Sequence, residues 1–296
     1  MNIRKPLLLL GIILMSGFFI FASKMDFASS WVAYLNPNYF PIEIDFAGEA
    51  VPLQIADVQE RLDRELLVNK NLDASTLLIL KRAKRAFAVI EPVLKQNGIP
   101  DDFKYLAVIE SGLMNVVSPA GAKGIWQFMP ETAREIGLEV NENIDERYHL
   151  EKSTEAACTY FLKAKEKFGN WTLTAAAYNA GSAGIQKQME FQKVSNYYDL
   201  LLNEETSRYV FRILALKQIM KNPKQYGFPI SEEEQYRMVL TKKIVIDSTV
   251  NNLADLAIKQ GINYKLLKIH NPWLRTTKIV NTSNKKYQIE IPLEGF

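Results

Sequence analysis

The sequence predicts a mainly α-helical domain followed by a small α+β module. Apolar residues recur three and four positions apart in several segments up to about residue 221, which is the spacing of one helix face. The strict alternation of a half-buried strand is nearly absent over the same stretch. Beyond residue 240 the pattern changes to strand, helix, helix, strand, so we expect two folded units in the 296-residue chain.

The N-terminal segment, residues 1–24, has Arg4 and Lys5 ahead of an apolar run. This order is typical of a signal peptide or a short membrane anchor, and both interpretations stay open because the length of the run suits neither fully. Positive charge before the run predicts that the rest of the chain lies outside the cytoplasm. We therefore expect the protein in the cell envelope on the periplasmic face, either anchored in the inner membrane or secreted to the periplasm.

The helical domain is predicted at residues 51–228, after a linker at residues 25–50 that wraps onto it. The linker contains prolines and a glycine with little periodicity. The second expected helix has a basic face with Lys81 and Lys84, which we interpret as solvated, with an acidic partner such as wall polymer as the alternative. The expected helices share an apolar stripe, and they cover residues 53–68, 73–97, a stretch after Asp102 that bears Glu110, 131–136, 156–168, 171–178 and 205–221.

The second unit is predicted at residues 240–296, joined to the first by an acidic connector at residues 229–239. Alternating apolar residues predict its two strands, and helical spacing predicts the two helices between them. In chain order these elements cover residues 242–247, 253–261, 265–270 and 287–292.

Composition excludes several classes of protein. The formal net charge is +3, so the chain lacks the strong basic excess of a nucleic-acid-binding protein. One cysteine, Cys158, cannot form an intrachain disulfide, and with only two histidines a Cys/His zinc site is not expected.

Glu110 is the candidate catalytic residue. On a helix Leu106, Glu110 and Met114 lie on one face together with Leu113, so a carboxylate falls in an apolar stripe. Apolar surroundings favour the neutral form and predict a raised pKa, which is what protonating a leaving-group oxygen requires. The alternative is a boundary residue whose stem packs and whose carboxylate reaches water.

A glycine-rich loop follows at residues 118–129. Glycine lets the backbone approach a ligand closely, because it has no side chain. Trp126 and Met129 add apolar surface to this loop, and Gln127 adds an amide that donates and accepts hydrogen bonds. Tyr178 and Asn179 are expected at a helix end, which is a suitable place to direct side chains into a site; core packing of Tyr178 is the alternative.

Three motifs in this order resemble lytic transglycosylases, which have a goose-lysozyme-like (SLT) catalytic domain. They are Glu110-Ser111, residues 121–130 (GAKGIWQFMP) and residues 176–181 (AAYNAG), and together they are specific where each alone is weak. Residues 44–53 resemble the entry to the catalytic region of the membrane-bound lytic murein transglycosylase D type. The resemblance covers about residues 36–220 and implies a lysozyme-like helical fold.

The resemblance also implies a reaction. In this family a single Glu, here Glu110, protonates the β-1,4 bond between N-acetylmuramic acid and N-acetylglucosamine in peptidoglycan glycan strands. The same Glu then removes the proton of the muramoyl 6-hydroxyl, which closes a 1,6-anhydro ring without water, metal or cofactor. By the family pattern the sugar-binding residues are Ser118, Gln127, Met129, Tyr178, Asn179 and Tyr209. Ser118 is expected to approach the N-acetyl group or Glu110. Residues 205–210 (ETSRYV) resemble a late motif of the family, which places Tyr209 near Glu110.

Residues 240–296 resemble a degenerate LysM module. The order of Gly261, Asn271-Pro272 and residues 289–292 (IEIP) matches that pattern. The first turn departs from it, because the usual Gly-Asp-Thr is replaced by residues 247–249 (DST). Sugar binding and a purely structural role both stay open for this module.

Two alternatives to the transglycosylase remain. A muramidase would cleave the same bond with water and would need a second carboxylate, for which Asp101, Asp102 and Glu131 lie too near helix starts to be convincing. A non-catalytic wall-binding scaffold is less favoured, since Glu110 is retained in its motif. The N-terminal segment would add contact with the membrane if it is not cleaved.

Overall fold

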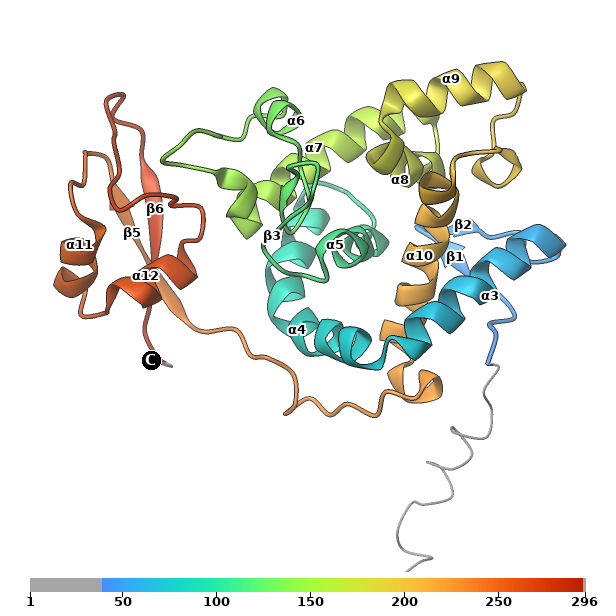
Figure 1. The fold of residues 1–296 in the computed structure, drawn as a ribbon, viewed down its shortest axis with the longest axis horizontal. Helices are drawn as coiled ribbons and strands as arrows, with labels where there is room; N and C mark the ends of the chain where they lie inside the picture. Colours follow the sequence, from blue (N-terminus) through green and yellow to red (C-terminus); the bar gives the residue numbers. More distant parts are fainter. Residues whose placement is uncertain (1–38, 295–296) are drawn as a thin grey trace, which may run out of the picture.

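The computed structural model describes residues 39–294 (Figure 1). The predicted signal peptide or anchor at residues 1–24 lies outside the described residues. Within residues 39–294, no helix has both the length and the apolar character needed to span a bilayer.

The first unit is helical, and the prediction of a mainly α fold is confirmed. Two small hairpins and helix α9 were not predicted, while the other helices begin or end within a few residues of their expected bounds. The helices are α3 Ala56–Asn71, α4 Asp73–Gln96, α5 Lys104–Ser111, α6 Pro130–Glu135, α7 Leu150–Phe168, α8 Trp171–Ala180, α9 Ser182–Gln192 and α10 Glu204–Lys221. Between them lie the hairpins β1 Asp45–Phe46 with β2 Glu49–Ala50 and β3 Val116–Val117 with β4 Lys123–Gly124, and the 3-10 turns η1 Asp101–Phe103, η2 Glu146–Tyr148, η3 Tyr197–Asp199 and η4 Pro223–Tyr226.

Helix α5 lies inside the helical unit, between α4 and α10 (Figure 1). Its residues from Tyr105 to Ile109 are all buried, so it has no polar face along most of its length. A helix of this length is not stable alone in water, and its position is therefore set by its neighbours. Helix α10 is the central neighbour, since it also packs against α3 and α8.

The end of α5 differs from the prediction. Gly112 adopts φ +60° and its N–H bonds to the Val108 carbonyl at 2.8 Å, which stops the helix directly after Ser111. Leu113 also has a positive φ, so the chain leaves the helix axis there. The predicted stripe that included Leu113 and Met114 is therefore wrong, and Glu110 stands in the last turn of its helix.

The N-terminal hairpin is bound to the helical core through a buried lysine. Lys217 on α10 is 2% exposed, and its Nζ donates to the Asp102 carboxylate at 2.6 Å and to the Asp45 carbonyl at 2.6 Å. The N–H of Ala47, in the hairpin turn, donates to the same Asp102 carboxylate at 2.7 Å. Residues 45–50 therefore lie against the core as a wrap would.

The connector lies along the basic face of α4. The Lys84 ammonium pairs with Glu232 at 3.2 Å, and the Tyr236 N–H donates to the Lys81 carbonyl at 2.7 Å. Figure 1 shows the connector running from the end of α10 past α4 to the second unit. The expected basic face thus has an acidic partner within the same chain.

The second unit has the predicted strand, helix, helix, strand order. Its elements are β5 Thr241–Ile246, α11 Leu253–Lys259, α12 Tyr264–His270 and β6 Tyr287–Pro292, with β5 and β6 antiparallel. Its apolar core is separate from that of the helical unit, but it includes Ile144 and Tyr148 of the helical unit. The two units therefore meet at residues 144–148.

Candidate active site

Glu110 faces the long helix α10. The Tyr209 hydroxyl donates to Glu110 Oε1 at 2.5 Å, across 99 residues of sequence. Burial raises the pKa of Tyr209, so this phenol stays protonated and can only donate to the carboxylate. The Arg212 guanidinium, one turn further along α10, donates to the Ile109 carbonyl at 3.2 Å.

The pKa of Glu110 is raised to about 7. Burial is the largest cause, because the half-buried carboxylate is poorly hydrated when charged. The Tyr209 hydrogen bond and the Arg212 charge oppose this rise, whereas the Glu205 carboxylate adds to it. The direction expected from the sequence is therefore present, and it leaves a carboxyl group that exchanges its proton near neutral pH.

The glycine-rich loop is fastened to α5 directly after the glutamate. Ser111 is buried, and its hydroxyl is a hydrogen-bond donor to two carbonyls. The Ile125 carbonyl lies at 2.8 Å and the Ala107 carbonyl at 3.1 Å. Ser118 shapes the start of the loop, since its Oγ accepts from the Ala122 N–H at 3.0 Å. The Ser118 hydroxyl is thus used inside the loop, and no described hydrogen bond joins it to Glu110.

Gln127 and Met129 lie at the C-terminal end of this loop, just before α6. Gln127 adopts φ +52°, and its Nε2 donates to the Gly124 carbonyl at 2.7 Å and to the Val116 carbonyl at 3.1 Å. This strained conformation turns the chain between β4 and α6. Met129 precedes α6 and is 40% exposed, so its thioether side chain is available to a ligand.

Tyr178 and Asn179 come from the last turn of α8. The Tyr178 hydroxyl donates to the Trp126 carbonyl at 2.7 Å, so Tyr178 joins α8 to the loop. Asn179 joins α8 to α10, since its Oδ1 accepts from Thr206 at 2.8 Å and its Nδ2 donates to Glu205 at 3.1 Å. Both side chains therefore hold the three elements around Glu110 together.

Two charged residues at this site were not predicted to act on Glu110. Glu205 and Arg212 both act on the pKa of Glu110, and they lie four residues before and three residues after Tyr209. Because residues three and four apart share a helix face, the expected place of Tyr209 near Glu110 already implied these two neighbours. Glu205 and Arg212 also line a surface pocket of about 360 Å³ together with Glu204 and Arg208.

The other carboxylates weighed from the sequence are used elsewhere. Asp102 binds Lys217, and Asp101 pairs with Lys104 at 2.6 Å. Glu131 is exposed on α6 and lies 3.9 Å from Arg134. None of the three contributes to the pKa of Glu110.

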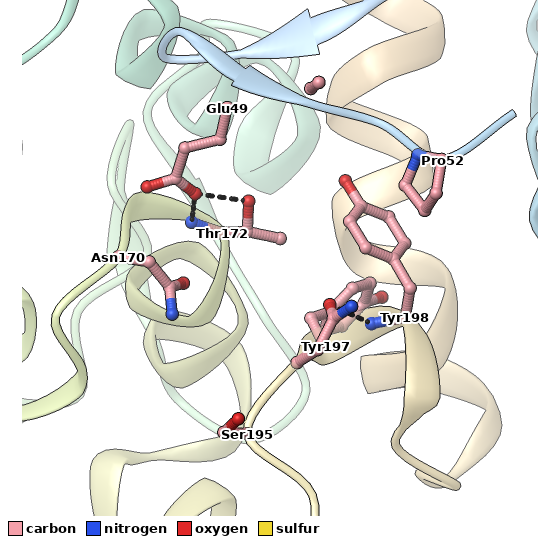
Figure 2. A pocket seen from close by; sticks show the side chains of 9 residues that line it. Glu49, Pro52, Asn170, Thr172, Ser195, Tyr197 and Tyr198 are labelled. Carbon is pink, nitrogen blue, oxygen red and sulfur yellow. Dashed lines mark hydrogen bonds between the residues drawn. The ribbon is translucent and has the colours of Figure 1, made fainter.

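A second pocket, of about 270 Å³, lies at the opposite end of α8 from Tyr178 (Figure 2). Its carboxylate, Glu49, accepts from the Trp171 N–H at 2.6 Å, the Thr172 N–H at 2.9 Å and the Thr172 hydroxyl at 2.7 Å. Figure 2 shows Glu49 reaching the first turn of α8. Glu49 therefore caps the N-terminus of α8, and both of its carboxylate oxygens are used in that role.

Comparison with known proteins identifies the unit that carries Glu110. Residues 87–200 match the family model of the transglycosylase SLT domain. This chain carries an SLT domain. The matched residues include Glu110, the glycine-rich loop, Tyr178 and Asn179, while α10 with Tyr209 follows the match. Residues 242–295 match the model of the soluble lytic transglycosylase C-terminal LysM-like domain. The resemblances inferred from the sequence are thereby confirmed.

Relatives of this chain are named lytic transglycosylases. It is 30% identical over 235 residues to membrane-bound lytic murein transglycosylase D of Escherichia coli strain K12, and equally to that of strain CFT073. The match covers 76% of this chain and 50% of each relative, so the chain spans about half the length of these curated relatives. A solved structure of an inactive mutant of lytic transglycosylase Slt from Pseudomonas aeruginosa is 21% identical with a TM-score of 0.37, covering 51% of this chain and 26% of that one.

Among residues 39–294 the SLT domain and the module contain no group of three or more His, Cys, Asp or Glu side chains arranged to hold a metal ion. Around Glu110 the candidate site contains the Tyr209 hydroxyl as a donor and the charges of Glu205 and Arg212.

Proposed function

We propose that this protein is a peptidoglycan lytic transglycosylase that cleaves the β-1,4 bond between N-acetylmuramic acid and N-acetylglucosamine. The product would carry a 1,6-anhydro ring on the muramic acid. One observation carries the proposal: in an SLT domain, Glu110 has a pKa of about 7 and accepts a hydrogen bond of 2.5 Å from Tyr209. A general acid works best when its pKa lies near the working pH.

The first step uses Glu110 as the acid. Its proton moves to the glycosidic oxygen as the bond to the muramoyl C1 breaks, and positive charge develops on that ring. The substrate's own N-acetyl group stabilises this charge. Glu110 becomes a carboxylate, which the Tyr209 hydroxyl and the Arg212 charge stabilise.

The second step uses Glu110 as the base. The carboxylate takes the proton of the muramoyl 6-hydroxyl, and that oxygen bonds to C1 to close the anhydro ring. Glu110 is protonated again, so one side chain completes the cycle and no water is consumed. Its near-neutral pKa suits both steps, because neither proton transfer then meets a large energetic barrier.

The sugar-binding roles of the remaining residues are part of the proposal. Met129 would offer an apolar surface to a sugar ring, and Gln127 would offer its amide oxygen, because its nitrogen is used by the loop. Ser118 would approach the N-acetyl group from the start of the loop. Tyr178 and Asn179 would contact sugars with the parts that remain free of their structural hydrogen bonds.

A muramidase is the second candidate, and Glu205 is the observation that favours it. Its carboxylate raises the pKa of Glu110 and so acts on it through space. A hydrolase needs such a second carboxylate to activate water. However, Glu205 accepts a hydrogen bond from Asn179, which occupies one of its oxygens.

The location and partners follow from the same proposal. An enzyme of peptidoglycan glycan strands acts in the cell envelope, and the relatives are membrane-bound by name. We extend this to the finer prediction that the N-terminal segment either anchors the chain in the inner membrane or directs it to the periplasm.

Mass spectrometry of the fragments released from purified cell wall tests the proposal. We expect anhydro ends from the wild type and no release by a folded Glu110→Gln variant, with Glu131→Gln as the matched control on an exposed glutamate. Reducing ends in place of anhydro ends would establish the muramidase. Cleavage by Glu110→Gln at the wild-type rate would refute the role of Glu110.

A further inference from the structure

The C-terminal module is docked on the SLT domain through backbone pairing. The Asp145 N–H donates to the Trp273 carbonyl at 2.9 Å, and the Arg275 N–H donates to the Asn143 carbonyl at 2.8 Å. Between these bonds Ile144 and Leu274 form an antiparallel bridge. Residues 143–145 therefore pair with the module as a short strand would.

Side chains extend this contact. Ile144 is 1% exposed and belongs to the apolar core of the module, as does Tyr148. The Arg275 guanidinium lies 4.1 Å from the centre of the Tyr148 ring. Because the module core is small, burying two side chains of another unit in it makes the two units structurally dependent.

The segment at residues 143–148 also contacts the glycine-rich loop at residues 118–129. Arg147 and Asp145 form a buried two-pronged ion pair with both contacts at 2.8 Å. The remaining nitrogen of Arg147 donates to the Phe128 carbonyl at 3.1 Å and the Gly121 carbonyl at 3.4 Å. Its planar guanidinium thus binds a carboxylate and two loop carbonyls at once, which a lysine could not do.

Gly124 shows how closely the loop and this segment approach. It adopts φ +84°, and a Cβ placed there would lie 1.9 Å from the Arg147 carbonyl oxygen. The backbones are therefore in direct contact at the point where the loop turns toward Gln127. Any displacement of Arg147 must move the loop with it.

We infer that the C-terminal module acts as a brace, meaning that it positions the glycine-rich loop at residues 118–129. It does so by binding residues 143–148, and Arg147 passes the effect to the loop. Arg147 is then a positioning residue for Gln127 and Met129. The inference rests on the proposed function only for its effect on turnover. It supports the structural interpretation of the LysM-like module.

Ile144→Asp in the full chain tests this inference, because a carboxylate cannot remain in the module core without a partner. Ile258→Asp is the matched control, since Ile258 is on α11 of the same module and is 72% exposed. Hydrogen exchange followed by mass spectrometry is the readout. We expect amides of residues 118–129 to exchange about tenfold faster or more in Ile144→Asp, with α3 and α10 unchanged, and no change in the control.

Two results would overturn the inference. One is faster exchange at residues 143–148 and 272–276 without a change in the loop, and the other is unchanged exchange at all three places. If Ile144→Asp fails to fold, Ile144→Ala with Ile258→Ala as control gives the same comparison with a smaller expected effect.

Turnover on short soluble glycan fragments provides a second readout. A misplaced loop is expected to lower kcat about 10- to 100-fold in Ile144→Asp, because small displacements of positioning groups have effects of that size. If the module only bound sugar, Ile144→Asp would instead raise KM on intact wall and leave kcat on fragments unchanged. That result would overturn the inference. Absence of anhydro product from the wild type would refute the proposed function, while the exchange result would still decide the brace.

Discussion

Glu110→Gln should make the protein more stable, and more so as the pH rises. The pKa of Glu110 is about 7 in the folded chain against an ordinary value of 4.5. A carboxyl group whose pKa is raised by folding binds its proton more tightly in the folded state, so ionisation above pH 4.5 favours unfolding. This loss is complete once the pH exceeds the folded value of about 7.

The magnitude follows from the two pKa values. Because of this difference, ionisation of Glu110 lowers the free energy of unfolding by about 3 kcal/mol at pH 8 and by about 1 kcal/mol at pH 5. Gln cannot ionise, and its amide oxygen still accepts the hydrogen bond from Tyr209. The variant should therefore gain about 2 kcal/mol more at pH 8 than at pH 5, which is about 4–8 °C in Tm for a chain of this size.

Thermal unfolding at pH 5 and pH 8 measures this difference directly and needs no substrate. Glu131→Gln is the control, because Glu131 is 73% exposed and its replacement should change stability by less than about 0.5 kcal/mol. An equal Tm change for Glu110→Gln at both pH values would refute the reasoning. So would a destabilised variant at pH 8, since that would mean that the charged carboxylate is favoured by its surroundings.

Three further changes probe the site and its support. Tyr209→Phe removes a donor that lowers the pKa of Glu110, so the alkaline limb of the pH–rate profile should move up by about one pH unit; a downward move would contradict the assigned direction of that hydrogen bond. Gly124→Ala should lower both Tm and activity, because the added carbon would meet the Arg147 carbonyl at 1.9 Å, whereas Gly137→Ala has open space and should show only the milder strain of a positive φ. Lys217→Met should lower the free energy of unfolding by about 3–5 kcal/mol by leaving a buried carboxylate without its cation, as chemical denaturation would show; a change below about 1 kcal/mol would mean that water replaces the ammonium.

Local patterns predicted much of the helical unit. The apolar spacing in residues 73–97 and 205–221 requires only neighbours on one helix face, so α4 and α10 were predicted closely. Short elements were harder, because a two-residue strand pair such as β3 with β4 has no periodicity to detect. The end of α5 was placed too late, since left-handed backbone at Leu113 has no signature in an apolar side chain.

The candidate site also contains residues that the sequence predicted and residues whose role depends on packing. Glu110, Gln127, Tyr178 and the rise in the pKa of Glu110 were predicted from motifs and from an apolar context. No action on Glu110 was predicted for Glu205 or Arg212, although both share a helix face with Tyr209. Their effect depends on charges that come together only when α10 packs against α5.

By itself, the sequence determined most of the helices, the strand–helix–helix–strand module and the carboxyl group that would exchange protons, since each depends on residues close together in the chain. Tertiary structure alone decided that the Glu205 and Arg212 charges act on the pKa of Glu110 and that Ile144 belongs to the core of the other unit. Such contacts depend on the path of the whole backbone, because burial and charge act through space and not along the sequence.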